Sequence, residues 1–371
     1  MRIVYFTHSL DSCWNHGNAH FLRGVLSELI ARGHDVSVHE PADSWSRANL
    51  VSDHGEEALA AYHTAYPELS SWRYAAEVDP AALVDGADVV IVHEWNDHGL
   101  VAALGSLRKA GATFTLLFHD THHRAVSAPD EMRAYDLSGY DGVLAFGEAL
   151  SRVYRDWGWG KRVWTWHEAA DTRRFFPMEG ERSGLVWIGN WGDGERTAEI
   201  EQFLLAPARD AGLPLDIYGV RYPEEGKAML ARYGARYHGW APNAAAPAIF
   251  ARALATVHVP RRYYTTILPG IPTIRVFEAL ACGIPLVSAP WDDAEGLFRP
   301  GEDFLFAADG TAMTRTLAAL RDDPELRAAL ARSGLETILA RHTCAHRVDE
   351  LIAILDCFDA PSLSAARSTV A

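Results

Sequence analysis

The chain of 371 residues contains only four cysteines, and none of them forms a Cys-x-x-Cys pair. They are Cys13, Cys282, Cys344 and Cys357. Disulfide frameworks and cysteine zinc sites belong mainly to short chains or to closely spaced cysteines, so this spacing argues against both. The cysteine usage fits a reducing compartment, and we expect a cytoplasmic protein.

Long apolar runs are also absent. No stretch reaches the roughly 18 apolar residues that a membrane-spanning helix needs, so we expect no transmembrane segment. The first residues, MRIVYFTHSL, carry one basic residue and a short apolar run followed by polar residues. This pattern predicts a first β-strand rather than a signal peptide.

Positive charge is scarce as well. The chain has 34 Lys and Arg residues against 49 Asp and Glu residues, which gives a formal net charge of −15. An acidic surface repels the phosphates of nucleic acids and anionic lipid headgroups. We therefore expect neither nucleic acid nor a membrane surface as a partner, although this net charge is compatible with a local basic pocket.

What the sequence does contain predicts a two-domain α/β protein. Hydrophobic residues make up 49% of the chain and charged residues 22%, so it can bury large cores. A chain of this length suits two domains of roughly 150–200 residues each. Strand-like and helix-like runs alternate throughout, which is typical of parallel sheets with right-handed crossovers. We predict two doubly wound, Rossmann-like sheets that face an interdomain cleft.

The alternation can be placed along the chain. The predicted strands are 1–7, 34–41, 87–94, 113–120, 140–147, 162–169, 184–190, 213–220, 253–260 and 284–290. The predicted helices are 19–32, 99–110, 197–205 and 274–282, followed by mostly helical sequence from 311 to 358. We predict an N-terminal domain over 1–170, a linker over 171–184, a C-terminal domain over 185–343, a helix over 344–360 that packs back on the N-terminal domain, and a disordered tail over 361–371.

Polar side chains follow four of the predicted strands. The runs are THSLDSCWNHGNAHF, HEWNDHG, HDTHH and GNWGDGER. A single polar residue after a strand is commonly a helix cap or a solvated loop residue. Ligands of open α/β sheets bind outside the carboxyl ends of the strands, so four loops enriched in the same way predict a functional cleft.

The histidines allow a second interpretation, a metal site. The run HDTHH at 119–123 resembles a ligand cluster, because imidazole is the commonest metal donor. The chain has no His-Glu-x-x-His motif, however, and no spacing of a closed metal site. We therefore predict no metal and no cofactor.

From Tyr237 onward the sequence resembles glycosyltransferases of the GT-B fold. The similarity is to the retaining, family-4-like group and especially to its spore-maturation-protein-like branch. The most specific piece is RVFEALACGIPLVS at 275–288, and NHGNAHFLRGVLSELIARGHDVSVHE and HEAADTRRFFP resemble the opening glycine loop and the linker of that group. The resemblance covers nearly all of the chain except 41–80 and the tail.

The resemblance implies transfer of a hexosyl unit from a nucleotide-sugar donor, a UDP- or GDP-sugar, that is bound at Ile271–Phe306. Glu278 is expected to accept hydrogen bonds from the ribose hydroxyls. The start of its helix favours an anion by roughly 0.3–2 kcal/mol. Arg196 is expected to neutralise the leaving diphosphate through contacts worth roughly 1.5–3 kcal/mol. The remaining donor-side residues are Asn190, Arg261, Arg262, Thr273, Ile274, Arg275 and Val276.

The N-terminal domain is expected to supply the other half of the site. The resemblance implies that His119 contacts the donor sugar, that Gly17 and Asn18 lie in the donor loop, and that His16 lies where donor and acceptor meet. Glu94, Asn96 and Asp97 are expected to line the acceptor side. The acceptor itself, a glycan or a small molecule, is not identified by the sequence.

One position departs from the family pattern. The family often carries a second Glu eight residues before the ribose-binding one, and this chain has Gly270 there. Retention of configuration is expected from the family, but inversion with His16 as general base stays open. Two further functions are compatible with the same fold: a sugar-nucleotide epimerase and a non-catalytic protein that binds a nucleotide or a glycan.

Overall fold

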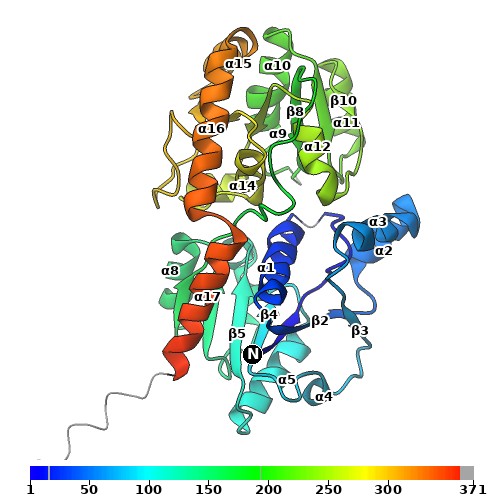
Figure 1. Ribbon diagram of the computed structural model, residues 1–371, viewed down its shortest axis with the longest axis vertical. Helices are drawn as coiled ribbons and strands as arrows, with labels where there is room; N and C mark the ends of the chain where they lie inside the picture. Colours follow the sequence, from blue (N-terminus) through cyan, green and yellow to red (C-terminus); the bar gives the residue numbers. More distant parts are fainter. Residues whose placement is uncertain (16, 193, 360–371) are drawn as a thin grey trace, which may run out of the picture.

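The computed structural model describes residues 1–15, 17–192 and 194–359 and shows two α/β domains, each built on one parallel sheet (Figure 1). The N-terminal sheet has the strand order β3-β2-β1-β4-β5-β6-β7. Its strands are β1 (Arg2–Phe6), β2 (Asp35–Pro41), β3 (Trp72–Tyr74), β4 (Val89–His93), β5 (Thr115–Asp120), β6 (Gly142–Ala145) and β7 (Val163–Thr165). The order reverses between β1 and β4, and an open sheet leaves a ligand crevice at such a point.

Helices connect these strands. They are α1 (Ala19–Ala31), α2 (Trp45–His54), α3 (Glu57–Ala65), α4 (Pro80–Leu83), α5 (His98–Lys109), α6 (Arg124–Ser127), α7 (Pro129–Arg133) and α8 (Glu148–Asp156). The helix α1 is the most buried of them, because Phe21, Val25, Leu26 and Leu29 pack into the core. The strands β1 and β4 are apolar on both faces, as a parallel sheet covered by helices requires.

The C-terminal sheet has the strand order β10-β9-β8-β11-β12-β13. Its strands are β8 (Leu185–Ile188), β9 (Leu215–Tyr218), β10 (Arg236–Tyr237), β11 (Ala255–His258), β12 (Leu286–Ser288) and β13 (Leu305–Phe306). Its helices are α9 (Thr197–Ile200), the π-helix η1 (Glu201–Leu205), α10 (Ala206–Asp210), α11 (Glu224–Arg232), the 3-10 helix η2 (Asn243–Ala245), α12 (Ala246–Phe250), α13 (Arg262–Thr266), α14 (Ile274–Ala281), α15 (Gly310–Asp322) and α16 (Pro324–Arg341). The strand order reverses between β8 and β11.

The predicted fold class, two doubly wound parallel sheets, is confirmed. The elements α2, α3 and β3 lie in the stretch 41–80, where no element was expected from the sequence, and β10 and β13 are only two residues long. The helix predicted at 197–205 continues to Asp210 through a π-helical turn, since Pro207 has no N–H to give the carbonyl of Phe203. Within the described residues, no helix is both long and apolar enough to cross a membrane.

Two chain segments cross between the domains and hydrogen-bond to each other. The amide of Ala170 donates to the carbonyl of His342 at 2.9 Å, and the amide of Cys344 donates to the carbonyl of Ala170 at 2.9 Å. The helix α17 (Cys344–Asp359) then runs along α1 of the N-terminal domain (Figure 1). The buried indole of Trp166 donates to the carbonyl of Arg347 at 2.8 Å. The C-terminal helix is therefore part of the N-terminal domain's packing.

We predict that Gly24→Ala lowers the free energy of unfolding by about 1–3 kcal/mol. A Cβ at Gly24 of α1 would lie 2.5 Å from Sγ of Cys344 and 2.7 Å from Cβ of Asp171, so the crossing segments would have to move. Gly105→Ala in α5 is the control, because its nearest neighbour would be 3.5 Å away. Helix propensity should then raise the stability by up to about 1 kcal/mol. Chemical denaturation of both variants checks this, and equal shifts would contradict it.

Candidate active site

A cavity of about 540 Å³ is lined by loops at the carboxyl ends of both sheets. A volume of this size accommodates a ligand as large as a cofactor. The N-terminal half contributes His8, Asn15, Gly17, Asn18, Trp45, Trp95, Thr121, His122, His123, Phe146 and Glu168. The C-terminal half contributes Trp187, Ile188, Gly189, Asn190, Glu195, Arg196, Arg221, Val257, His258, Val259, Arg261, Tyr264, Thr273, Ile274 and Arg275.

The loop after β1 is fixed against both domains. The amide of Asn18 donates to the carbonyl of Thr121 at 3.2 Å and also contacts its hydroxyl. A Cβ built at Gly17 would lie 3.6 Å from Cγ2 of Ile274 at the start of α14. The backbone of this loop therefore lies within van der Waals reach of the start of α14.

Arg196 is a buried cation on the cavity wall. It is 9% exposed, and its guanidinium donates to the carbonyls of Val259 at 2.8 Å and Asn190 at 2.7 Å. No carboxylate of the described residues lies within ion-pair distance of Arg196. Burial lowers the pKa of Arg196 to about 10, and the charge of Arg261 acts in the same direction. A buried charge without a counterion is costly, so this position favours an incoming anion.

Two further arginines lie near Arg196, and each is paired with a glutamate. Arg261 pairs with Glu195 at 2.8 Å, and Arg275 pairs with Glu278. The first residue before α14 is Thr273, whose side chain does not cap the helix. The amide of Ile274 instead interacts with the buried Glu168, and a helix N-terminus attracts negative charge. This side of the cavity has the chemistry of a diphosphate site.

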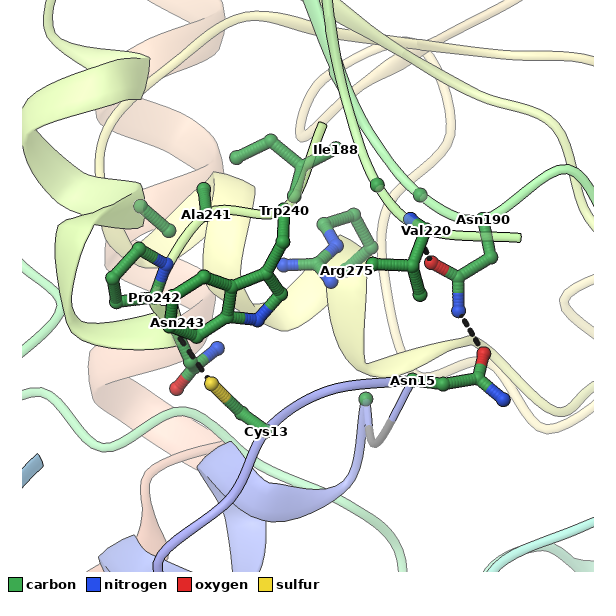
Figure 2. A pocket seen from close by; sticks show the side chains of 14 residues that line it. Cys13, Asn15, Ile188, Asn190, Val220, Trp240, Ala241, Pro242, Asn243 and Arg275 are labelled. Carbon is green, nitrogen blue, oxygen red and sulfur yellow. Dashed lines mark hydrogen bonds between the residues drawn. The ribbon is translucent and has the colours of Figure 1, made fainter. Parts of the chain in front are cut away.

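A narrower pocket of about 80 Å³ adjoins the cavity (Figure 2). In the view of Figure 2, Arg275 lies between Trp240 and Asn190. The side chain of Asn190 accepts from the amide of Val220 at 3.0 Å and donates to the side chain of Asn15, so it links the two domains. The indole nitrogen of Trp240 is buried without a hydrogen-bond partner among the described residues.

Glu278 lies behind this pocket rather than on its wall. Its side chain is fully buried and accepts from the amide of Asn243 at 2.8 Å, with Nδ1 of His20 at 3.3 Å. Its other oxygen pairs with Arg275. Burial raises the pKa of Glu278, and the charge of Arg275 opposes that rise. Asn243 and Arg275 themselves reach the pocket, so the expected ribose contact of Glu278 stays a prediction.

His119 lies near the end of β5 but is buried behind the cavity, so its predicted contact with the donor sugar stays a prediction. The side chain is 2% exposed, hydrogen-bonds with the hydroxyl of Tyr5 and packs edge-on against Trp166 at 4.8 Å. Burial lowers the pKa of His119 well below its usual value. The reason is that β5 continues to Asp120, so position 119 still belongs to the packed sheet. His122 and His123, beyond the end of the strand, line the cavity instead.

The three residues predicted for the acceptor side also lie elsewhere. Glu94 is fully buried. Asn96 holds the loop together by donating to the carbonyls of Phe6 at 3.0 Å and His93 at 2.8 Å. Asp97 caps α5 by accepting from the amide of Gly99 at 2.7 Å. Their neighbour Trp95 reaches the cavity.

The other predicted residues divide as follows. Eight of them line the wall of the cavity, namely Gly17, Asn18, Asn190, Arg196, Arg261, Thr273, Ile274 and Arg275. Arg262 is not on the wall and pairs with Glu199 at 3.2 Å, while Val276 is buried in the core. The side chains of both residues therefore lie off the cavity wall, and their predicted donor contacts stay predictions. His16 lies outside the described residues.

Several residues that line the cavity had no specific role assigned from the sequence, although most lie in the polar runs noted there. They are His8, Trp45, Trp95, Thr121, His122, His123 and Glu168. Glu168 is 2% exposed, and its Oε1 has no partner among the described residues. Burial raises the pKa of Glu168 well above its usual value, and the amide of Ile274 opposes the rise. Glu168 belongs to the run HEAAD. Because that run resembles the family's linker, Glu168 was not predicted to be a site residue.

The backbone conformation explains why a glycine stands at the position that departs from the family pattern. Gly270 has φ of +91°, and a Cβ there would lie 3.2 Å from Cβ of Ala294 and 3.3 Å from Cγ of Glu295. A glutamate would therefore be strained at this position.

The sequence also predicts the absence of a metal. No group of three or more His, Cys, Asp or Glu side chains in 1–15, 17–192 and 194–359 is arranged to hold an ion. The absence of a metal from the reaction stays a prediction.

Part of the chain is similar to a known protein family. Residues 196–353 match the model of a family described as glycosyl transferase-like. No curated relative matches the chain in sequence. The matched residues lie in the C-terminal domain and its last helix, and this similarity agrees with the predicted resemblance to GT-B glycosyltransferases of group 1. The comparisons do not show the spore-maturation-protein-like branch.

Solved structures share the fold over nearly the whole chain. Sucrose-phosphate synthase from Thermosynechococcus elongatus has a TM-score of 0.64 at 15% identity and covers 97% of this chain and 99% of its own. HepE from Anabaena, in complex with UDP and glucose, has a TM-score of 0.67 at 14% identity and covers 96% and 99%. T4 phage BGT, in complex with UDP and Mn²⁺, has a TM-score of 0.60 at 11% identity and covers 96% and 100%.

We predict that Glu94→Gln weakens the pH dependence of stability. Burial raises the pKa of Glu94 to about 8 from an ordinary value of 4.5. Its contribution to stability is therefore fully present below about pH 4.5 and is lost as the pH rises through about 8. Melting temperatures between pH 5 and 9 should fall less in Glu94→Gln than in the wild type. Asp97→Asn, which keeps the acceptor that caps α5, is the control and should follow the wild type.

Proposed function

We propose that this protein transfers a hexosyl unit from a nucleoside-diphosphate donor to an acceptor hydroxyl, without a metal ion, in the cytoplasm. The observation that carries the proposal is Arg196, a buried guanidinium in the interdomain cavity with no carboxylate partner among the described residues. Arg261, Arg275 and the N-terminus of α14 lie on the same side. Such a set of donors stabilises the charge that develops on a leaving diphosphate.

The pocket beside this cluster fits the nucleoside. Trp240 offers a ring for stacking and an indole N–H, while Asn190 and Asn243 offer amide groups. The ribose would meet Asn243 and, behind it, Glu278. HepE and T4 phage BGT were each solved with UDP, so we propose UDP as the first nucleotide to test.

We further propose retention of configuration at the anomeric carbon. Burial lowers the pKa of His8 to about 3 and that of His123 to about 4. Such imidazoles are weak bases at neutral pH, and burial raises the pKa of Glu168 well above its usual value, which disfavours its charged form. Because these three described groups are disfavoured as bases, we assign the role of base to the departing diphosphate. It would take the proton on the face that it leaves, and the configuration of the product, determined by NMR, checks this.

Arg196→Ala and the larger Arg196→Met should lower kcat/KM for donor consumption roughly 10- to 150-fold. This factor corresponds to the loss of one charge-assisted contact worth about 1.5–3 kcal/mol. Arg262→Ala is the matched control, because Arg262 is exposed and pairs with Glu199 outside the cavity. It should keep wild-type kinetics with UDP-sugars.

The outcomes separate transfer from the two other functions that the fold supports. Wild-type kinetics in both Arg196 variants would refute the role of the cavity in transfer. Conversion of a UDP-sugar to a new UDP-sugar without any acceptor would identify an epimerase. UDP binding in calorimetry, with no donor consumed under any acceptor, would identify a non-catalytic binding protein.

A second experiment tests the ribose contact of Glu278. If its carboxylate accepts from the ribose, the wild type should bind UDP at least about tenfold more tightly than 2′-deoxy-UDP. Glu278→Gln should lose most of that preference, because a neutral amide oxygen is a weaker acceptor. Calorimetry on the four combinations measures the coupling directly. An undiminished preference in Glu278→Gln would show that the ribose is held by other groups.

A further inference from the structure

Two tryptophans line the N-terminal side of the cavity and keep much of their surface exposed. Trp45 begins α2, and Trp95 follows β4. The two residues are 41% and 37% exposed. Exposed aromatic surface in a concave site marks a place where a ligand buries it. No part of the proposed donor site uses these two rings.

The two indoles are held in place before any ligand binds. The imidazole of His8 lies 6.2 Å from each indole centroid and is parallel to Trp45 within 9°. Trp14 packs edge-on against Trp45 at 5.7 Å, and the guanidinium of Arg124 lies 4.3 Å from the ring centre of Trp95. We call His8, Trp45 and Trp95 the aromatic platform. A ligand that stacks on it need not order these side chains first.

Apart from Arg124, which is stacked on Trp95, the groups that the platform's neighbours present to the cavity are polar and uncharged. Asn18, Thr121 and His122 lie on the same wall and offer amide, hydroxyl and imidazole groups. Burial lowers the pKa of His8 to about 3 and that of His122 well below its usual value, so both are neutral at pH 7. The arginines of the cavity wall come instead from the C-terminal domain. The cavity therefore has a cationic donor side and a neutral, aromatic side.

This combination specifies the chemistry of the occupant. A pyranose ring has apolar C–H faces that pack on aromatic rings, and hydroxyls around its edge that pair with neutral polar groups. The described N-terminal residues that line the cavity include no Lys or Arg, so an anionic acceptor would find no cation among them, and the guanidinium of the nearby Arg124 is stacked on Trp95. A purely apolar or phenolic acceptor would leave the amide, hydroxyl and imidazole groups unpaired.

We infer that the acceptor is a neutral saccharide that packs on Trp45 and Trp95 and directs hydroxyls toward Asn18, Thr121 and His122. The inference rests on the proposed function for the transfer itself. In that step the bond between the anomeric carbon and the diphosphate oxygen breaks. A bond from the anomeric carbon to an acceptor oxygen forms, and the hydroxyl proton passes to the diphosphate.

Saccharide binding can be measured without any turnover. Saturation-transfer NMR with cellobiose, lactose and maltose should show binding to the wild type. Glucose 6-phosphate, glucuronic acid and phenol should bind more weakly. Trp45→Ala and Trp95→Ala should each weaken disaccharide binding about tenfold, and Trp45→Phe should restore most of it. Binding of UDP, which occupies the opposite side, reports whether each variant is folded.

Trp72→Ala is the control, because Trp72 is 71% exposed on β3 and does not line the cavity. It should bind disaccharides like the wild type. The inference is overturned if no neutral disaccharide binds, if anionic sugars or phenol bind better, or if both alanine variants bind like the wild type. A failure of donor consumption with disaccharide binding intact would refute the proposed transfer and leave the saccharide site standing.

Discussion

The cavity depends on the hydrogen bonds between the two segments that cross from one domain to the other. The amides of Ala170 and Cys344 each donate across this crossing at 2.9 Å, and α17 then packs on α1. Because the crossing is short and paired, it sets how closely the carboxyl ends of the sheets face each other. Glu168 lies two residues before the bridge and reaches the cavity, where the amide of Ile274 opposes the rise of its pKa. The connection between the domains thus also forms part of the site.

The two domains contribute residues of different charge to the cavity wall. Arg196, Arg261 and the start of α14 make the C-terminal side positive, although the chain as a whole has a net charge of −15. The N-terminal side is kept neutral by burial, which lowers the pKa values of His8 and His122. An anionic leaving group and an uncharged acceptor would meet at the boundary. In the proposed reaction, this difference in charge would place the anionic donor against the C-terminal domain and the neutral acceptor against the N-terminal domain.

Much of the fold could be predicted because its signals are local. Buried parallel strands such as β1 and β4 are continuous apolar runs, and α1 shows its buried face in the spacing of Phe21, Val25 and Leu29. The elements that escaped prediction are short or amphipathic, and they owe their form to neighbours distant in sequence. The edge strand β3, for example, exists because Trp72 to Tyr74 pair with His39 to Pro41.

The sequence by itself determined the fold class and the loops that carry the site, because strand periodicity and the glycines of tight turns are properties of neighbouring residues. Only the tertiary structure decided which side chains of those loops reach the cavity. His119 lies within β5 and packs inward while His122 faces the cavity, and Glu94 is buried while the adjacent Trp95 is partly exposed. Those choices depend on where each strand ends and on what packs against it. Both are set by contacts between residues far apart in the chain.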